Sequence, residues 1–141
     1  MRRRFTRGNR GARNIPLKPG ALALLFAKFF KDYLPRRGMT THTLQSYRDA
    51  LELFLRFVAG RRRCRVEALN IEHLTAADVE EFLTHLERTR GNGISTLNAR
   101  LAALRTFVRF VASEAPEYLV ELQRILAIPF KRAASGSLAS I

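Results

Sequence analysis

Apolar residues recur at intervals of three and four along most of this chain, which is the period of one face of an α-helix. Residues with strong turn preferences, mainly proline and glycine, divide this pattern into five segments. Strict alternation of apolar and polar positions, which is typical of strands, never continues for more than a few residues. The sequence therefore predicts an all-α fold of four or five helices, at 21–34, 41–59, 75–88, 95–113 and 117–127.

Local residue types set the ends of the second predicted helix. Thr40 or Thr41 offers the N-cap, because a hydroxyl oxygen can accept a hydrogen bond from a free amide of the first turn. Gly60 is expected to close the helix. The next residues, 61–74, show no sustained period and predict a basic loop. Three apolar residues of this loop are expected to face the core: Leu69, Ile71 and Leu74.

The third and fourth predicted helices form a pair joined by a tight turn. Thr75 followed by Asp78 is close to a capping box, with Asp in place of the usual Glu or Gln. A Gly-Asn-Gly turn at 91–93 requires positive φ, which glycine adopts easily. Ser95 is the expected N-cap of the fourth helix.

Length and composition indicate a single domain. A chain of 141 residues is long enough to bury a core of its own, and we assign the folded domain to residues 21–128. The single cysteine, Cys64, can form neither an internal disulfide nor a zinc site, so the expected compartment is the cytoplasm. No apolar run approaches the roughly 20 residues of a membrane-spanning helix, so no membrane partner is expected.

The positive charge of the chain is unevenly distributed. The formal net charge is +13, and residues 1–20 hold seven basic residues and no acidic ones. This segment has too few apolar residues to offset the entropy lost on ordering, so we expect a disordered basic arm. Such an arm would add affinity for a polyanion without regard to base sequence. The alternative is a solubilising tail with no binding role.

Four residues of the fourth predicted helix form a polar window on an otherwise apolar surface. A turn of 100° per residue places them within about 60° of one another. They are Asn98, Ala102, Arg105 and Arg109, with Ala99 at the edge. No Asp or Glu occurs between 95 and 113, so these arginines are expected to be unpaired and to face a polyanion. Arg and Asn can bind phosphates and base edges, and alanine allows close approach, so the window predicts a contact with double-stranded DNA. The alternative is a solvated face that only serves solubility.

The first turn of the second helix is a second candidate for anion binding. Its free amides and the positive end of the helix dipole favour a phosphate. The polar residues there are Thr41, His42, Thr43, Gln45 and Ser46. The alternative for the threonines is simple helix capping.

Catalytic and metal-binding patterns do not stand out in the sequence. The three histidines are scattered, with no Asp, Glu or Cys at ligand spacing beside them. The three tyrosines lie within apolar stripes and are expected in the core. No glycine-rich phosphate loop and no Ser, His and Asp arrangement is evident. We therefore expect neither enzyme activity nor a cofactor.

Four segments resemble the N-terminal core-binding domain of the tyrosine recombinases, the phage integrase family. Residues 43–57 are similar to the second helix of that domain, and residues 74–83 to its third. Residues 95–110 are similar to the fourth helix, and residues 128–132 resemble the segment that leads into the interdomain linker. The matches occur in the order and spacing of the family.

This resemblance implies a SAM-like orthogonal bundle that binds one face of a recombination half-site, with the second and fourth helices at the major groove. It adds Lys131 and Arg132, in the linker segment, to the predicted DNA contacts. In the family, a separate C-terminal domain carries the residues that cleave DNA. The sequence ends about where that domain would begin, so no catalytic residue is carried over, and residues 129–141 are expected to be a truncated interdomain linker.

Three alternatives remain open at this point. The chain can be part of an active recombinase whose catalytic domain is separately encoded. It can dock other recombinase subunits through an apolar edge formed by Phe107, Phe110 and Val111. It can also be a stand-alone regulator, in which the turn at 91–93 joins the two helices of a helix-turn-helix.

Overall fold

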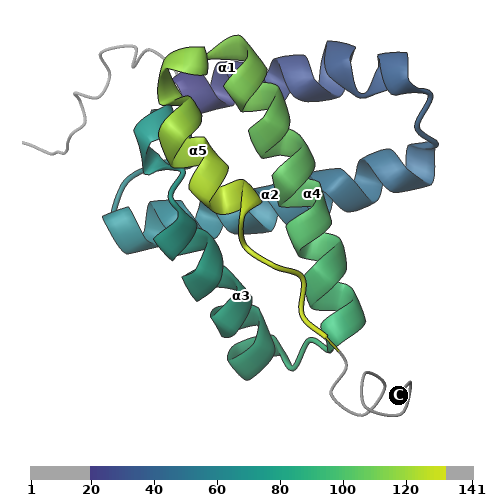
Figure 1. Ribbon diagram of the computed structural model, residues 1–141, viewed down its shortest axis with the longest axis vertical. Helices are drawn as coiled ribbons and strands as arrows, with labels where there is room; N and C mark the ends of the chain where they lie inside the picture. The colour runs from purple at the N-terminus through teal and green to yellow at the C-terminus, as the bar shows by residue number, and fades with distance from the viewer. Residues whose placement is uncertain (1–19, 133–141) are drawn as a thin grey trace, which may run out of the picture.

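The computed structural model describes residues 20–132, and this part of the chain is helical with no strand (Figure 1). The all-α prediction is confirmed. The five α-helices are α1 (Ala21–Lys28), α2 (Thr41–Arg62), α3 (Ala76–Arg90), α4 (Ile94–Glu114) and α5 (Leu119–Leu126). Five short helical turns connect or extend them: η1 (Phe29–Tyr33), η2 (Pro35–Arg37), η3 (Val66–Ala68), η4 (Ile71–His73) and η5 (Pro116–Tyr118). The expected arm at 1–19 and the end of the expected linker, 133–141, lie outside the described residues.

The helices form an orthogonal bundle around α4. In Figure 1, α2 runs across behind α4, α5 lies beside the upper half of α4, and a turn joins α3 to the lower end of α4. α1 continues into the π-helical turn η1, so the predicted helix at 21–34 changes hydrogen-bond pattern after Lys28. The N-terminal halves of α2 and α4 diverge from their crossing, and residues of both line one cleft (Figure 1).

The core is built largely from aromatic and leucine side chains that converge on α4. Phe29 of η1 lies 5.1 Å from Phe107 and 5.4 Å from Phe110, measured between ring centroids. Phe54 of α2 lies 5.3 Å from Phe82 of α3. Edge-to-face and tilted pairs of this kind add to the free energy gained by burial alone. Eight of the 21 residues of α4 are buried: Leu97, Leu101, Ala103, Leu104, Phe107, Val108, Phe110 and Val111. The polar residues of α4 lie on the remaining surface of the helix.

This packing contradicts the apolar docking edge expected on the fourth helix. Phe107 and Val111 have no exposed surface, and Phe110 is only 3% exposed. The sequence period could not separate an internal contact from an external one, because both use the same apolar spacing. The partner of this edge is η1 of the same chain.

Two predicted helix ends are wrong. Gly60 lies inside α2, which continues to Arg62 and ends where Arg63 adopts a left-handed φ of 54°. Ser95 is not the cap of α4, because Gly93 occupies the N-cap position and Ile94 begins the helix. The N-cap of α2 is Thr40, one of the two expected residues, whose hydroxyl accepts from the amide of Thr43.

The segment that follows α2 is ordered by its apolar residues, as expected. Leu69, Ile71 and Leu74 are buried, within and around the short turns η3 and η4. The chain also enters the bundle here, because the Gly20 amide donates to the Glu67 carbonyl at 2.6 Å. A Cβ at Gly20 would lie 2.1 Å from the Leu69 carbonyl oxygen, so only glycine fits this close approach.

Candidate nucleic-acid interface

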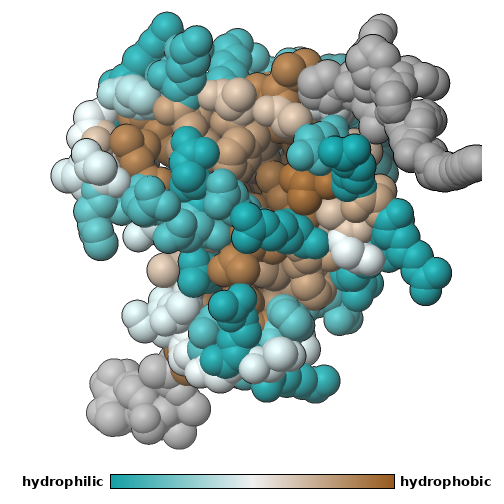
Figure 2. All heavy atoms as spheres, turned by 180° about the vertical axis from the view of Figure 1, so that it is seen from behind, coloured by the Kyte–Doolittle hydropathy of each residue, from teal (hydrophilic) through white to brown (hydrophobic). Residues whose placement is uncertain are grey.

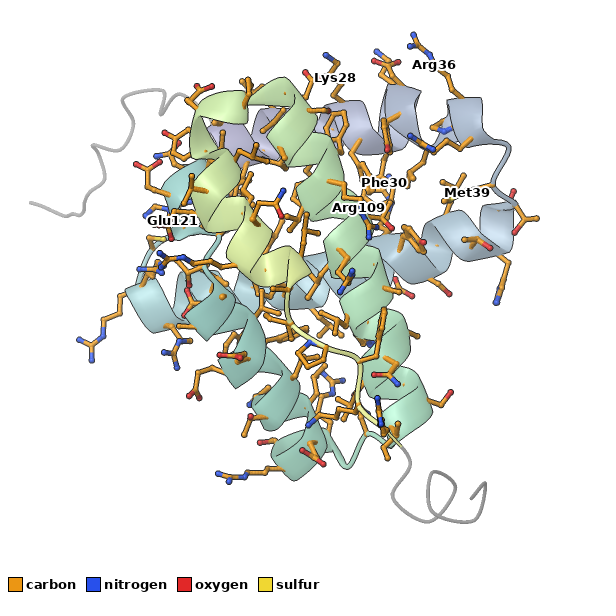
Figure 3. The ribbon with its side chains drawn as sticks, in the orientation of Figure 1. Lys28, Phe30, Arg36, Met39, Arg109 and Glu121 are labelled. Carbon is orange, nitrogen blue, oxygen red and sulfur yellow. The ribbon has the colours of Figure 1, made fainter. Side chains whose placement is uncertain are left out.

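The polar window predicted on the fourth helix is present on one face of α4. Ala99 and Arg109 are exposed, Ala102 is partly buried, and Arg109 lies in the upper half of the helix (Figure 3). Within residues 20–132, neither Arg105 nor Arg109 has a carboxylate at ion-pair distance. The buried faces of α4 fix the direction of this strip, since they pack on η1, α2 and α5.

Two residues of the window already bind backbone groups of the same chain, so the expectation that its polar side chains are all unpaired is wrong. Asn98 binds the backbone of Lys131 through both atoms of its amide, at 2.9 Å and 2.8 Å. Arg105 donates from Nη1 to the carbonyl of Ile128 at 3.1 Å, and its guanidinium lies 5.2 Å from the ring centroid of Phe130. Helix periodicity could not reveal this, because the contacts come from a segment more than 20 residues away in the sequence.

The first turn of α2 is also partly engaged in local bonds. The amide of Thr43 donates to Oγ1 of Thr40 at 3.1 Å, and the two hydroxyls are 3.0 Å apart. Gln45 donates to Asp49 at 2.9 Å. Thr41, His42 and Ser46 are exposed. The capping side chain is therefore Thr40, and neither Thr41 nor Thr43 caps the helix.

A cleft of about 320 Å³ opens in the angle between the N-terminal halves of α2 and α4, and we call it the α2–α4 corner. It brings together Ser46 and Ala99 of the predicted set. Most of its lining side chains are small, and four of the lining residues carry a hydroxyl. The lining residues are Ser46, Tyr47, Ala50, Ser95, Thr96, Ala99, Arg100 and Ala103.

Arg100 is the one charged residue that lines the corner, and the sequence reasoning missed it. Its Nε atom is buried and has no hydrogen-bond partner within the described residues. Buried donors are nearly always paired, so this Nε is unusual, and Asn92 Oδ1 is the other buried side-chain atom of residues 20–132 without a partner. A turn of 100° per residue places Arg100 about 140° from Arg105, outside the predicted window. Arg100 lines a cleft only because α2 packs beside it, and the position of α2 cannot be predicted from the sequence of α4.

The start of α4 increases the positive potential of the corner. Its N-cap, Gly93, has no side chain to bind the free amides, and the first turn has no acidic residue. The positive end of the helix dipole is therefore uncompensated there, close to Ser95, Thr96 and Arg100. This arrangement suits an anion with several acceptor oxygens.

A second cleft on the molecule has the opposite character. Apolar patches show between hydrophilic side chains on the rear face (Figure 2). The cleft has a volume of about 310 Å³ between α1, α2 and η3 and includes Leu22, Phe26 and Leu55. Its charged residues are Glu52, Glu67 and Arg56, so its net charge is unfavourable for phosphate. The α2–α4 corner is the better candidate for a polyanion.

The remaining chemistry of residues 20–132 is limited. No group of three or more His, Cys, Asp or Glu in this range could hold a metal ion. Tyr33 stacks on Phe29, with centroids 5.5 Å apart, and Tyr47 lines the corner. None of the helices described is sufficiently long and apolar to cross a bilayer.

The chain is a member of the phage integrase family. The family model of the phage integrase N-terminal SAM-like domain matches residues 26–115, from α1 to the end of α4. The resemblance to the N-terminal domain of the tyrosine recombinases is thereby confirmed.

Two proteins of Sinorhizobium fredii (strain NBRC 101917 / NGR234) are similar to this chain, and both are named integrase/recombinase. One, y4rC, is 39% identical over 116 residues, and the other, y4rD, is 43% identical over 113 residues. These alignments cover 82% and 79% of this chain, but only 35% and 40% of the relatives. The chain thus corresponds to well under half of either relative. No solved structure matches it significantly.

Proposed function

We propose that this chain is a DNA-binding module of a tyrosine-type, site-specific recombinase or integrase, and that it binds duplex DNA with the α2–α4 corner. The observation that carries the proposal is Arg100, whose buried Nε lacks a partner within residues 20–132. It lines a cleft with four hydroxyl-bearing residues beside an uncapped helix start. Phosphate oxygens would accept hydrogen bonds from the other donors of this guanidinium, from the hydroxyls and from the free amides at the start of α4.

The charge of the neighbouring surface supports the same partner. Arg109 has no acidic partner among residues 20–132, and Arg132 is exposed at the end of that range. Small residues on the rim would let the sugar–phosphate backbone approach α4 closely. The proposed contact set keeps ten of the predicted residues: Thr41, His42, Thr43, Gln45, Ser46, Ala99, Ala102, Arg109, Lys131 and Arg132. It adds three residues that line the corner: Ser95, Thr96 and Arg100.

We assign DNA binding rather than strand cleavage to these 141 residues. Under this proposal, the groups that break and rejoin DNA belong to polypeptide outside the sequence given, either in the same protein or separately encoded. Other recombinase subunits, a separate catalytic domain and a cytoplasmic location stay predictions.

The helix-turn-helix regulator is the weaker alternative. In that arrangement α3 would cross the DNA backbone, but its exposed residues include Glu80, Glu81 and Glu87. Like charges at that position oppose binding.

Fluorescence anisotropy with a labelled duplex, titrated at several salt concentrations, tests the proposal. We expect a dissociation constant on the order of 10⁻⁴ to 10⁻⁶ M for random sequence, weakening steeply between about 50 and 200 mM salt. Arg100→Ala is expected to weaken binding and to reduce the magnitude of the log–log salt slope by about 0.9, the value for one phosphate contact. Affinity that does not depend on salt would contradict the proposal.

Arg124→Ala is the matched control, because it removes the same charge from α5. Arg124 is exposed and lies 3.8 Å from Glu121, away from the corner. Ala99→Glu provides a second variant, since Ala99 is exposed and its replacement puts a negative charge on the corner without changing the core. We expect Ala99→Glu to weaken binding and Arg124→Ala to have little effect. Equal losses in Arg100→Ala and Arg124→Ala would mean that net charge alone drives binding.

A further inference from the structure

After α5 the chain turns back and runs along α4 as an extended segment, residues 128–131, which we call the strap. Figure 1 shows it descending from α5 across the lower half of α4, towards the turn between α3 and α4. Ile128, at its start, is buried, whereas Phe130 is 46% exposed. Burial therefore fixes only the first residue of the strap.

Polar contacts fix the other end. Asn98 accepts a hydrogen bond from the amide of Lys131 through Oδ1 and donates from Nδ2 to the carbonyl of the same residue. A side-chain amide that satisfies both backbone groups of one residue fixes the position and the orientation of the backbone at that residue. The ammonium of Lys131 also lies 3.8 Å from a carboxylate oxygen of Glu87, so the strap bridges α3 and α4.

Arg105 holds the beginning of the strap in the same way. Its Nη1 donates to the Ile128 carbonyl at 3.1 Å, and its guanidinium lies 5.2 Å from the ring centroid of Phe130. The cation–π contact gives a half-exposed aromatic ring a defined place. Of the five donors on this guanidinium, the strap takes one.

The spacing of the two anchors matches the length of the strap. Asn98 and Arg105 are seven residues apart, about 10.5 Å along a helix. Ile128 and Lys131 are three residues apart, about 10 to 11 Å when the chain is extended. The strap therefore runs antiparallel to α4, and its extended length is close to the rise of α4 between the two anchor residues.

We propose that Asn98 and Arg105 are positioning residues that clamp the strap onto α4 and so fix the direction in which the polypeptide continues past Arg132. This role differs from the DNA contacts first expected of these two side chains. Since α4 also carries the α2–α4 corner, the clamp ties the orientation of the following polypeptide to the helix that bears the candidate DNA face.

Amide hydrogen exchange and ¹⁵N relaxation on the 141-residue chain test the clamp. In the wild-type protein, we expect the Lys131 amide to be protected although it belongs to no helix. Asn98→Ala is expected to lower its protection by about tenfold and to reduce the backbone order parameters at 130–132. The amides of Leu101 and Leu104 should keep their protection, which shows that α4 remains folded.

Two further variants distinguish loss of the strap contact from a general loss of structure in α4. Asn98→Asp keeps the oxygen that accepts from the Lys131 amide, so it should preserve much of the protection. Ser95→Ala alters an exposed residue of α4 that does not touch the strap, and should leave the Lys131 amide unchanged. Rapid exchange of the Lys131 amide in the wild-type protein, or unchanged exchange in Asn98→Ala, would overturn the clamp.

DNA binding distinguishes this role from a direct contact. If Asn98 only positions the strap, its replacement acts on DNA binding only through Lys131 and Arg132, so Asn98→Ala should weaken duplex binding less than Arg100→Ala does. A loss of DNA affinity in Asn98→Ala with the strap still ordered would assign Asn98 to the DNA contact and overturn the proposal. The exchange measurement contains no DNA, so failure of the proposed function leaves the test of the clamp intact.

Discussion

Arg62, at the last position of α2, lies 2.7 Å from Asp78 in the first turn of α3, measured from Nη2 to Oδ2. Arg61 reaches the other oxygen of the same carboxylate at 3.2 Å. The Asp78 side chain is 7% exposed, while those of the two arginines are 47% and 36% exposed. This cluster ties α2 to α3 across the loop between them, and Thr75 completes it by accepting from the Asp78 amide.

Replacement of Asp78 by Ala should therefore destabilise the fold. The change removes two charge-assisted hydrogen bonds and a negative charge from the positive end of α3. We expect the free energy of unfolding to fall by about 1.5 to 3 kcal/mol, measured by urea denaturation. The partial exposure of both arginines keeps the loss below that of a fully buried pair. Glu81→Ala, an exposed control on the same helix, should stay within about 0.5 kcal/mol of the wild type.

Replacement of Gly60 by Ala should have the opposite effect. Gly60 lies inside α2, and a Cβ built there would meet no atom within 4 Å. Alanine loses less backbone entropy than glycine in a helix, so we expect a gain of about 0.5 to 1 kcal/mol in the free energy of unfolding.

Gly91→Ala is the matched control for Gly60→Ala. Gly91 caps α3 with a φ of 66°, a conformation that costs a residue with a Cβ about 1 to 2 kcal/mol. In urea denaturation, the free energy of unfolding should therefore rise for Gly60→Ala and fall for Gly91→Ala. A loss of stability in Gly60→Ala would mean that α2 ends at this glycine, as its sequence first suggested.

Leu104 and Arg109 lie on the same helix and should separate folding from surface function. Leu104 is 1% exposed, so Leu104→Ala should cost about 2 to 5 kcal/mol of unfolding free energy. Arg109 is exposed, and Arg109→Ala should change stability by no more than about 0.5 kcal/mol while weakening DNA binding. Thermal or urea unfolding checks the first statement and anisotropy the second. Similar destabilisation in both variants would contradict the surface position of Arg109.

Much of the helical layout could be predicted from residue spacing. The stripe on α4 places Leu97, Leu101 and Leu104 in the core, where the structure finds them. Side-chain caps were also accessible from sequence, as Thr40 and Thr75 show. Both features are local, because a helix repeats every 3.6 residues and a cap acts within three residues.

Helix ends that depend on distant packing were predicted less well. Gly60 stays helical because Val58 and Ala59 are buried beside it and because the next two residues, Arg61 and Arg62, bind Asp78 of α3. The free energy from these contacts exceeds the roughly 1 kcal/mol that a glycine costs inside a helix. The sequence alone gave no sign of the ion pairs, which join residues 16 and 17 positions apart.

The candidate site also combines features that the sequence predicts with features that only tertiary packing sets. By itself, the amino-acid sequence determined the helices, the core-facing stripes, the family and the excess of basic residues, since each depends on local period or composition. Only the tertiary structure decided which polar residues are free. It placed Arg100 in a cleft with α2 and engaged Asn98 and Arg105 with the strap, because these contacts depend on how segments distant in sequence pack against α4.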